Sequence, residues 1–451
     1  MRRRSRSLLV AGYLLLCILL GGSAQGLWRN LVLQLLGIAL IVWAASRPEP
    51  SEEDNGNPVV LYGLLGLGVL VVLVQLVPLP PDLWTALPGR SAIAEAYAAI
   101  GADLPWLPVS EAPYRSVLTL FAIIPGLAMF VGIKLLRPSP RWIALAIAAG
   151  MLCSIGLGAV QVASGPESAA YLYPIHNVGA VGLFANANHM GTLLLVSIPF
   201  AAALLVSSKS DRGGSTQGRI AVGIAALILV TVGIALNGSL AAVALAVPVL
   251  VASGALVPAA TRWRSLALPV AAVTLVAAVA LVALTPIGGM ASNLGPDSSV
   301  QGRSAIWRTT ARAIGESFPV GTGLGTFEPV YRQYEDPAAV TSEYVNHAHN
   351  DYLELVLELG AAGAVLIILF LGWWAVAATR VWTSTLSTPF GRAATIATAA
   401  ILAHSIVDYP LRTGALMAVF GAAIALMAQR SRSAPENKRS DLRPARHVKL
   451  G

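Results

Sequence analysis

Residues 346–354 bring together two imidazoles, two side-chain amides and two carboxylates. The segment reads Asn346-His347-Ala348-His349-Asn350-Asp351-Tyr352-Leu353-Glu354 and leads into an apolar run. Imidazole titrates near pH ~6.5, so either histidine can act as a general base toward a hydroxyl nucleophile. Ionisable side chains next to lipid are costly and are therefore usually functional or tightly paired. The segment predicts proton transfer on a polar substrate at a membrane surface; capping of the next helix and metal binding are the alternatives.

The segment continues as a polar stripe on an otherwise apolar helix. Asn350, Glu354 and Glu358 recur every four residues, which places them on one helical face. Carboxylates that enter a bilayer must face the protein interior or a water-filled cavity. The stripe therefore either orients the base or the substrate, or it is buried structural pairing with arginines. No third ligand accompanies the two histidines, and no phosphate-binding loop or DxD motif occurs, so we expect neither a metal nor a cofactor.

The composition is that of a membrane protein. Hydrophobic residues make up 56% of the 451 and charged residues only 12%, a balance that excludes an ordinary soluble globular chain. Apolar runs of roughly 18 residues, enough to span a bilayer as a helix, recur along the sequence. We expect an all-α polytopic fold with about 12 transmembrane helices. The expected spans lie near 8–22, 31–45, 58–78, 115–135, 141–163, 187–206, 220–236, 239–257, 265–285, 353–377, 393–408 and 413–429.

Loop charges orient these spans. With a cytoplasmic N-terminus, most of the 30 lysines and arginines, including every lysine, fall inside, as the positive-inside rule requires. Both termini are then cytoplasmic. Residues 1–24 also fit a cleavable signal peptide, but we favour a retained first helix. The chain divides into helices 1–9 over 1–285 with an outside loop at 79–114, a large outside loop at 286–352, helices 10–12 over 353–429, and a basic, disordered cytoplasmic tail at 430–451.

The cations expected outside are all arginines. Arginine presents a planar fork of donors that matches phosphate oxygens, so such a set above a membrane cavity suits a lipid pyrophosphate. The alternative is ordinary pairing with loop carboxylates, and Arg303 and Arg115 are better placed than the rest. Arg308 and Arg312 lie four apart on one face of a helix expected near 303–314. The full set is Arg29, Arg90, Arg115, Arg303, Arg308, Arg312, Arg332 and Arg412.

Two further polar groups lie at the outer ends of expected spans. Asn186, Asn188 and His189 open the sixth span, as helix caps or as substrate-binding donors. His404 and Asp408 lie four apart near the end of the eleventh span, followed by Arg412. For this second group we expect a buried structural His–Asp–Arg interaction.

Four stretches together give the chain a resemblance to the O-antigen ligase and O-antigen polymerase family of bacterial envelope-glycan assembly. They are Phe184–His189, Gly302–Trp307, Val345–Gly360 and His404–Asp408, so the resemblance covers most of residues 115–429. The histidine stretch is specific, and the other three are weaker alone. One departure concerns the span near 238–257: many members have an arginine directly after its serine, whereas this chain reads Ser239-Leu240. Arg115 or Arg412 can substitute for it, or the pyrophosphate is held differently.

The resemblance implies a GT-C-like, metal-independent, inverting glycosyltransferase at the periplasmic face of the bacterial inner membrane. The donor would be a glycan on undecaprenyl pyrophosphate, and His349 matches the family's base and Arg303 its loop arginine for pyrophosphate. The implied partners are this donor, an acceptor glycan or lipid A–core, membrane lipid and a chain-length regulator, without nucleic acid.

The acceptor divides the family. We favour a polymerase of exopolysaccharide or O-antigen repeat units over a ligase acting on lipid A–core or a protein glycosyltransferase. The competing class is a polysaccharide transporter or flippase. A transporter should place its key polar groups near the bilayer centre and carry repeat symmetry, whereas here they gather at outer helix ends and no repeat is evident.

Overall fold

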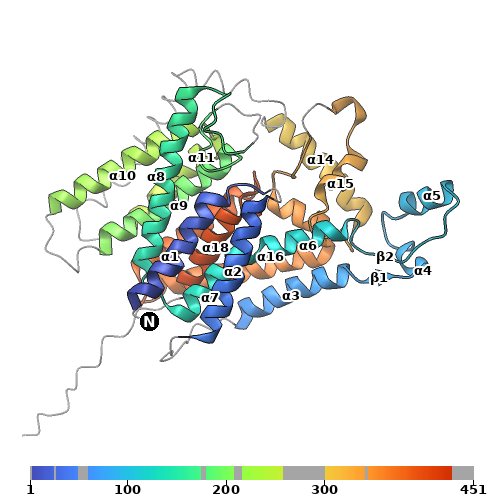
Figure 1. Ribbon diagram of the computed structural model, residues 1–451, viewed down its shortest axis with the longest axis horizontal. Helices are drawn as coiled ribbons and strands as arrows, with labels where there is room; N and C mark the ends of the chain where they lie inside the picture. The colour runs from blue at the N-terminus through green and yellow to red at the C-terminus, as the bar shows by residue number, and fades with distance from the viewer. Residues whose placement is uncertain are drawn as a thin grey trace, which may run out of the picture.

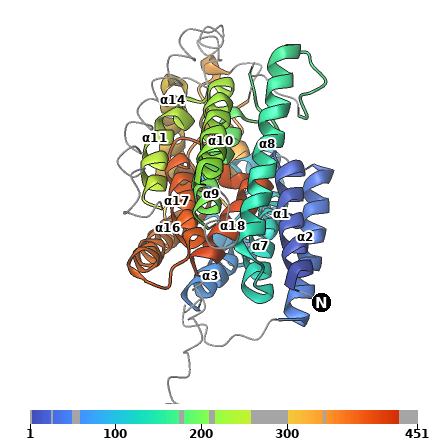
Figure 2. The same ribbon diagram turned by 90° about the vertical axis from the view of Figure 1, so that its left-hand side faces the viewer.

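The computed structural model shows a bundle of long apolar helices with a smaller helical region at one end (Figures 1 and 2). The structure describes residues 3–24, 27–48, 59–173, 179–207, 216–256, 300–340 and 344–428. The expected all-α architecture is confirmed for these ranges. The tail at 430–451 and the expected span at 265–285 lie outside them.

The described helices occur in the expected order, and two short strands that the sequence did not predict lie among them. In the first half they are α1 (Arg3–Leu20), α2 (Trp28–Ser46), α3 (Val59–Gln75), β1 (Pro78–Leu79), α4 (Pro81–Trp84), α5 (Ser91–Ala99), β2 (Leu107–Pro108), α6 (Pro113–Ala122), α7 (Ile124–Leu136), α8 (Pro140–Ser164), α9 (Ala187–Ser207), α10 (Thr216–Asn237) and α11 (Leu240–Gly254). After the undescribed stretch come α14 (Val300–Ser317), α15 (Phe327–Tyr334), η2 (Pro337–Ala339), α16 (Asp351–Thr383), α17 (Pro389–His404), η3 (Pro410–Arg412) and α18 (Gly414–Met427).

Every expected span within the described ranges coincides with a helix, but their lengths differ. In the described part of the chain, five segments are long and apolar enough to cross a membrane: Trp28–Ser46, Pro113–Leu136, Pro140–Ser164, Ala187–Ser207 and Asp351–Thr383. Others, such as α3, α11 and α18, are shorter apolar helices. The polytopic class is therefore supported, while the number of twelve crossings stays a prediction.

Proline and glycine break two of the expected spans. The span near 115–135 divides into α6 and α7 because Pro125, in the first turn of α7, has no N–H to continue the preceding helix. The span near 353–377 extends to Thr383 and bends at Gly360, which has φ 60° and ψ −140°. A side chain at Gly360 would meet the Pro319 carbonyl oxygen at 2.1 Å. This position therefore requires glycine.

A glycine-rich turn at residues 321–325, in the loop 286–352, packs against the bend in α16. The break exposes carbonyls that a straight helix would use itself. Thr322 N–H donates to the Leu357 carbonyl at 3.1 Å, and Gly323 N–H donates to the Glu358 carbonyl at 2.8 Å. The Gln75 amide at the end of α3 also donates to the Glu358 carbonyl, at 3.0 Å. These bonds tie the loop to the helix that carries the polar stripe.

Helix α9 lies in the middle of the bundle. It packs against α8, α10, α11 and α17, and its first half is buried on all sides. Because α9 begins directly after Asn186, this packing fixes where Asn188 and His189 point. Beyond the bundle, β1 and β2 pair antiparallel and carry α4 and α5, which project away from the other helices (Figure 1). The expected outside loop at 79–114 thus contains the helix α5.

We predict that Gly360→Ala lowers the stability of the protein strongly. The added methyl group would occupy a positive-φ position and collide with the backbone of Pro319, and such strain costs on the order of 1–3 kcal/mol or more. Thermal unfolding of the purified protein in detergent would measure it. Gly372→Ala, in the same helix with no atom within 4 Å of the added methyl, is the control and should be neutral or slightly stabilising. Equal melting temperatures for both variants would contradict the interpretation.

Candidate functional site

Four connections between helices meet at one end of the bundle. They comprise residues 179–189, 237–240, 346–351 and 404–413. Asn237 joins two of them, because its amide donates to the Ala180 and Ala187 carbonyls at 2.8 and 2.7 Å. Asp351 N–H donates to the Ser405 carbonyl at 2.9 Å, which joins the other two. The fourth stretch of the family resemblance joins them, because Trp307 Nε1 donates to the Ala348 carbonyl at 2.9 Å. All four stretches therefore meet in space.

Tyr409 stands at the centre of this meeting point, and rings of three histidines surround it. His347 lies against its face, with ring centroids 4.1 Å apart and an interplanar angle of 32°. His349 and His189 approach at 5.1 and 4.9 Å with angles of 70° and 86°. Burial, together with the charge of Asp408, raises the pKa of the Tyr409 phenol well above its usual range. The Tyr409 phenol is therefore uncharged, and its ring contacts all three histidines.

His347 forms a close pair with Glu354. Its Nδ1 lies 2.9 Å from Glu354 Oε1, and the Ala348 N–H donates to Oε2 at 2.9 Å. Glu354 receives these donors as well as Arg412, so it is ionised and His347 Nδ1 carries the proton. The Nε2 of a neutral His347 is then the acceptor nitrogen. Glu354 thus contacts a histidine, and its role in orienting the base stays a prediction.

His349 approaches the Tyr409 ring in a T-shaped contact and has a carboxylate of its own. Its Nδ1 is 3.6 Å from Asp408 Oδ1, an ion-pair distance that is longer than a hydrogen bond. His189 Nε2 lies 3.8 Å from the same oxygen. His349 has φ 48°, a left-handed conformation that is uncommon outside glycine and that concentrates at functional sites. The imidazole is held in this place by its backbone as well as by Asp408.

Arg412 gathers three carboxylates of α16. It lies 3.6 Å from Asp351, 3.3 Å from Glu354 and 3.0 Å from Glu358. Burial alone would lower the pKa of Arg412, but these three carboxylates raise it. The expected His–Asp–Arg interaction within 404–412 is therefore wrong in its last member. The stripe from α16 lies opposite Arg412, whereas Asp408 serves the histidines.

The remaining residues of the stripe and of α17 have structural partners. Asn350 caps α16 by accepting from the Tyr352 and Leu353 N–H groups at 3.0 Å, so it is the amide, not a histidine, that begins the helix. His404 Nδ1 lies 2.8 Å from the Thr192 hydroxyl. Glu354 and Glu358 are 1% and 0% exposed, in agreement with stripe residues that face the interior.

The amides before α9 also reach the site. Asn186 donates to the Tyr409 hydroxyl at 3.5 Å. Asn188 Oδ1 accepts from the Ser239 hydroxyl at 2.6 Å, and the same hydroxyl caps α11. Leu240, at the position where many members of the resembled family carry arginine, is 71% exposed. No charge at position 240 therefore contributes to this group.

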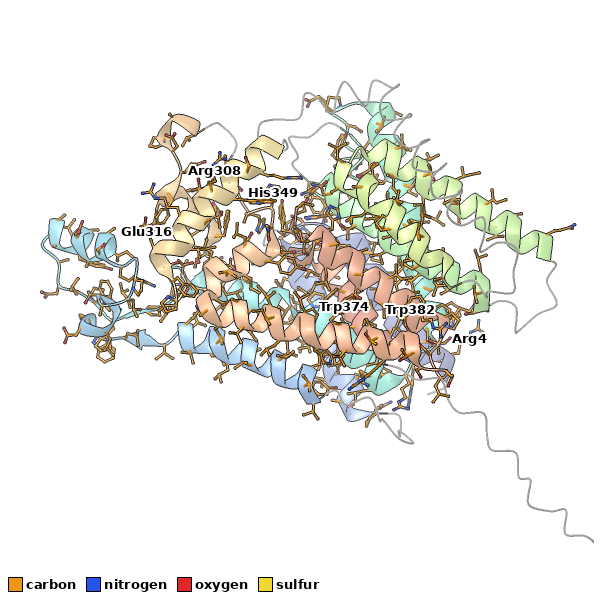
Figure 3. The ribbon with its side chains drawn as sticks, turned by 180° about the vertical axis from the view of Figure 1, so that it is seen from behind. Arg4, Arg308, Glu316, His349, Trp374 and Trp382 are labelled. Atoms are coloured by element: carbon orange, nitrogen blue, oxygen red, sulfur yellow. The ribbon has the colours of Figure 1, made fainter. Side chains whose placement is uncertain are left out.

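The arginines expected to bind pyrophosphate separate into three groups. Arg115 pairs with Glu328 at 2.7 Å, and Arg412 is occupied as above. Arg308 and Arg312 lie exposed on α14, where Arg312 pairs with Glu316 (Figure 3). Arg303 is partly buried near His404, and its Nε is buried without a hydrogen-bond partner among the described residues. Arg303 is thus the arginine of this set with a buried donor left unused, and it lies near His404.

A cavity of about 780 Å³ opens on the His347 side of Tyr409. The first turns of α2, α6, the turn at 324–328, the histidine segment and the start of α16 surround it. His347 and Arg412 line it, but His349 and Arg303 do not. Within the described ranges no group of three or more His, Cys, Asp and Glu side chains could hold a metal ion.

Sequence reasoning did not identify Tyr409 or Asp351 as site residues. Both lie next to residues that it did identify, since Tyr409 follows Asp408 and Asp351 follows Asn350. A tyrosine in an apolar segment gives no sign that it will separate two histidines. Its adjacency to Asp408 was the available signal.

We predict that Arg412→Leu destabilises the protein severely. Removing one partner of a buried charge cluster leaves the others uncompensated, which typically costs about 3–5 kcal/mol. The expected result is loss of folded protein or a large fall in melting temperature in detergent, with partial recovery in Arg412→Lys. Arg308→Leu, at an exposed site on α14, should behave like the unaltered protein. An Arg412→Leu protein as stable as Arg308→Leu would refute the role of this cluster.

Comparison with known proteins finds a similarity in the part of the chain that contains the histidine segment. A family model described as O-antigen ligase matches residues 224–368, which include Arg303, His347, His349, Glu354 and Glu358. A search of curated proteins finds no match. The family match supports the resemblance that the motifs carry, and it shows that residues 224–368 are similar to the O-antigen ligase family.

Proposed function

We propose that this protein transfers a glycan from a lipid pyrophosphate to an acceptor hydroxyl. Among the enzymes that do so, we propose that it is a polymerase of exopolysaccharide or O-antigen repeat units. The O-antigen ligase segment supports glycosyltransferase activity in general. We further propose that the donor glycan is carried on undecaprenyl pyrophosphate and that transfer inverts the configuration at its anomeric carbon. The reaction is proposed to take place at the periplasmic face of the inner membrane. In this topology both termini are cytoplasmic and the loop at 286–352 is periplasmic.

One observation carries the proposal: two imidazole–carboxylate pairs, His347–Glu354 and His349–Asp408, flank one tyrosine at the same end of the bundle. An imidazole whose second nitrogen faces a carboxylate is oriented and strengthened as a base. A transporter has no need of two such pairs at helix ends. The arrangement therefore favours group transfer over passage through the bilayer centre.

The proposed reaction uses His349 as the base. His349 takes the proton from an acceptor hydroxyl while the oxygen bonds to the anomeric carbon of the donor. The bond from that carbon to the pyrophosphate oxygen breaks, and its electron pair leaves with the lipid pyrophosphate. Arg303, with an unused buried donor near the histidines, stabilises the charge that develops on the leaving group. Asp408 stabilises the imidazolium that forms.

We predict that His349→Ala lowers transfer by roughly 10²–10⁴-fold, the usual cost of removing a general base. The assay uses purified protein in liposomes with lipid-pyrophosphate-linked repeat units, and gel analysis of glycan length reads the product. A melting temperature equal to that of the unaltered protein controls for folding. Undiminished transfer by a folded His349→Ala protein would refute the assignment of the base.

The same assay separates the acceptor classes. A ladder formed from repeat units alone supports the polymerase, and transfer only after lipid A–core is added makes the protein a ligase instead. Transfer only to an added protein substrate makes it a protein glycosyltransferase. Movement of donor across the bilayer without any glycan product would return the protein to the transporters.

The next prediction concerns the stabilisation of the pyrophosphate leaving group by Arg303. Arg303→Ala should lower turnover by about 10²-fold or more, because a preorganised donor to the developing charge is lost, and it should weaken inhibition by inorganic pyrophosphate. Arg308→Ala, five residues further along the same helix and exposed, is the matched control and should change both quantities little. Equal effects of the two substitutions would show that α14 contributes only general positive charge.

A further inference from the structure

The cavity of about 780 Å³ lies on one side of Tyr409, and the proposed base and leaving-group arginine lie outside its lining. Its size is typical of a small-molecule site. We infer that this cavity holds the acceptor saccharide, as an uncharged polyhydroxyl ligand, while the pyrophosphate of the donor lies outside it, on the His349 and Arg303 side of Tyr409. This inference rests on the proposed glycosyl transfer.

The charge of the lining disfavours a pyrophosphate on electrostatic grounds. The lining carries four carboxylates, Asp351, Glu354, Glu358 and Glu328, and two arginines, Arg115 and Arg412. Both arginines are already paired: Arg412 lies within 3.6 Å of three carboxylates and Arg115 lies 2.7 Å from the fourth. A polyanion would meet excess negative charge without an unpaired arginine to offset it. A neutral sugar pays no such penalty.

The cavity wall also offers hydrogen-bond acceptors that hydroxyl groups can fill. Glu358 is fully buried, and its Oε1 has no hydrogen-bond partner in the described part of the chain. His347 presents an Nε2 acceptor, because Glu354 fixes the proton on Nδ1. Asn346 adds an amide. Buried acceptors left unfilled are costly, and sugar hydroxyls supply the missing donors.

Aromatic side chains complete the lining opposite these acceptors. Tyr114 and Tyr344, both in the lining, are 73% and 54% exposed. Exposed aromatic rings at a concave site give a large apolar contact area together with a polar rim. The apolar faces of sugar rings fit such surfaces, while their hydroxyl edges reach the carboxylate side.

The position of Tyr409 connects this cavity to the proposed chemistry. His347 packs on Tyr409 with a centroid distance of 4.1 Å, and His349 lies 5.1 Å from the same ring. A saccharide that contacts His347 is therefore separated from His349 by about the width of the Tyr409 ring. Its reacting hydroxyl extends past Tyr409 to His349, and His347 and Glu358 bind the hydroxyls that do not react. His347 is then a binding residue and not the base.

The test blocks the cavity and leaves the histidines intact. Leu118→Trp places a bulky ring in the lining, whereas Val117→Trp adds the same ring one residue earlier on α6, outside the lining. The acceptor is a fluorescent, lipid-free oligosaccharide released from the polysaccharide of the source organism, and the donor is the lipid-linked repeat unit. We expect Leu118→Trp to raise the KM for acceptor by about tenfold or more, the equivalent of losing a hydrogen bond to a charged group. The KM for donor and its slow hydrolysis without acceptor should stay unchanged, as should all three in Val117→Trp.

A second pair of variants tests the assigned roles. His347→Gln and Glu358→Gln should raise the KM for acceptor with little change in kcat, in contrast to the fall in kcat expected for His349→Ala. A fall in kcat for His347→Gln at unchanged acceptor KM would make His347 the base and overturn the binding role. Equal rises in donor and acceptor KM for Leu118→Trp would place the donor in the cavity and overturn the inference, as would no change in either.

Binding without turnover separates this inference from the proposed function. Saturation-transfer NMR can detect the lipid-free oligosaccharide on the purified protein when no donor is present. If the unaltered protein gives no transfer product, the proposed function fails, yet loss of the NMR signal in Leu118→Trp and its retention in Val117→Trp would still support a saccharide site. Equal signals in both variants would overturn it.

Discussion

The contact of Arg412 with Asp351, Glu354 and Glu358 is the constraint on which the rest of the site depends. Buried carboxylates are unfavourable unless a cation compensates them, and Arg412, the last residue of η3, compensates all three. The contact locks the connection between α17 and α18 onto the first turns of α16. Asp408 and Tyr409 belong to that connection, so the same contact sets their distance from the histidines. By compensating the three carboxylates, Arg412 thus also fixes the positions of Asp408 and Tyr409.

A second constraint acts on the backbone. Gly360 interrupts α16, and the freed carbonyls of Leu357 and Glu358 accept hydrogen bonds from the glycine-rich turn of the long loop. The loop is therefore attached to the helix that carries the carboxylates, and α14 with Arg303 is attached through it. An unbroken helix would have no free carbonyls here and no room for the turn, because Gly321 and Gly360 approach too closely for any side chain. Strain at His349 adds a third fixed point.

Tyr409 divides the site into two environments with different electrostatics. On the His347 side the arginines are outnumbered and paired, and the wall offers acceptors and aromatic rings. On the His349 side lie Asp408, His189 and an arginine with an unused donor. A reaction that joins a hydroxyl-rich acceptor to a donor with an anionic leaving group needs such a separation. In the proposed reaction, the acceptor binds in the first environment, the leaving group in the second, and the two substrates meet at Tyr409.

The sequence by itself determined the all-α class, the order of the helices and the polar stripe, because hydrophobic run length and helical periodicity are local properties. It also identified the histidine segment, since ionisable groups beside apolar runs stand out in any membrane chain. It did not determine pairings between distant connections. Arg412 is near Asp408 in sequence, yet it pairs with α16, and Tyr409 gave no sign of its position between two histidines. Only the tertiary structure decided these, because the packing of α9, α16 and α17 chooses which helix ends meet, and charges then pair across that meeting point.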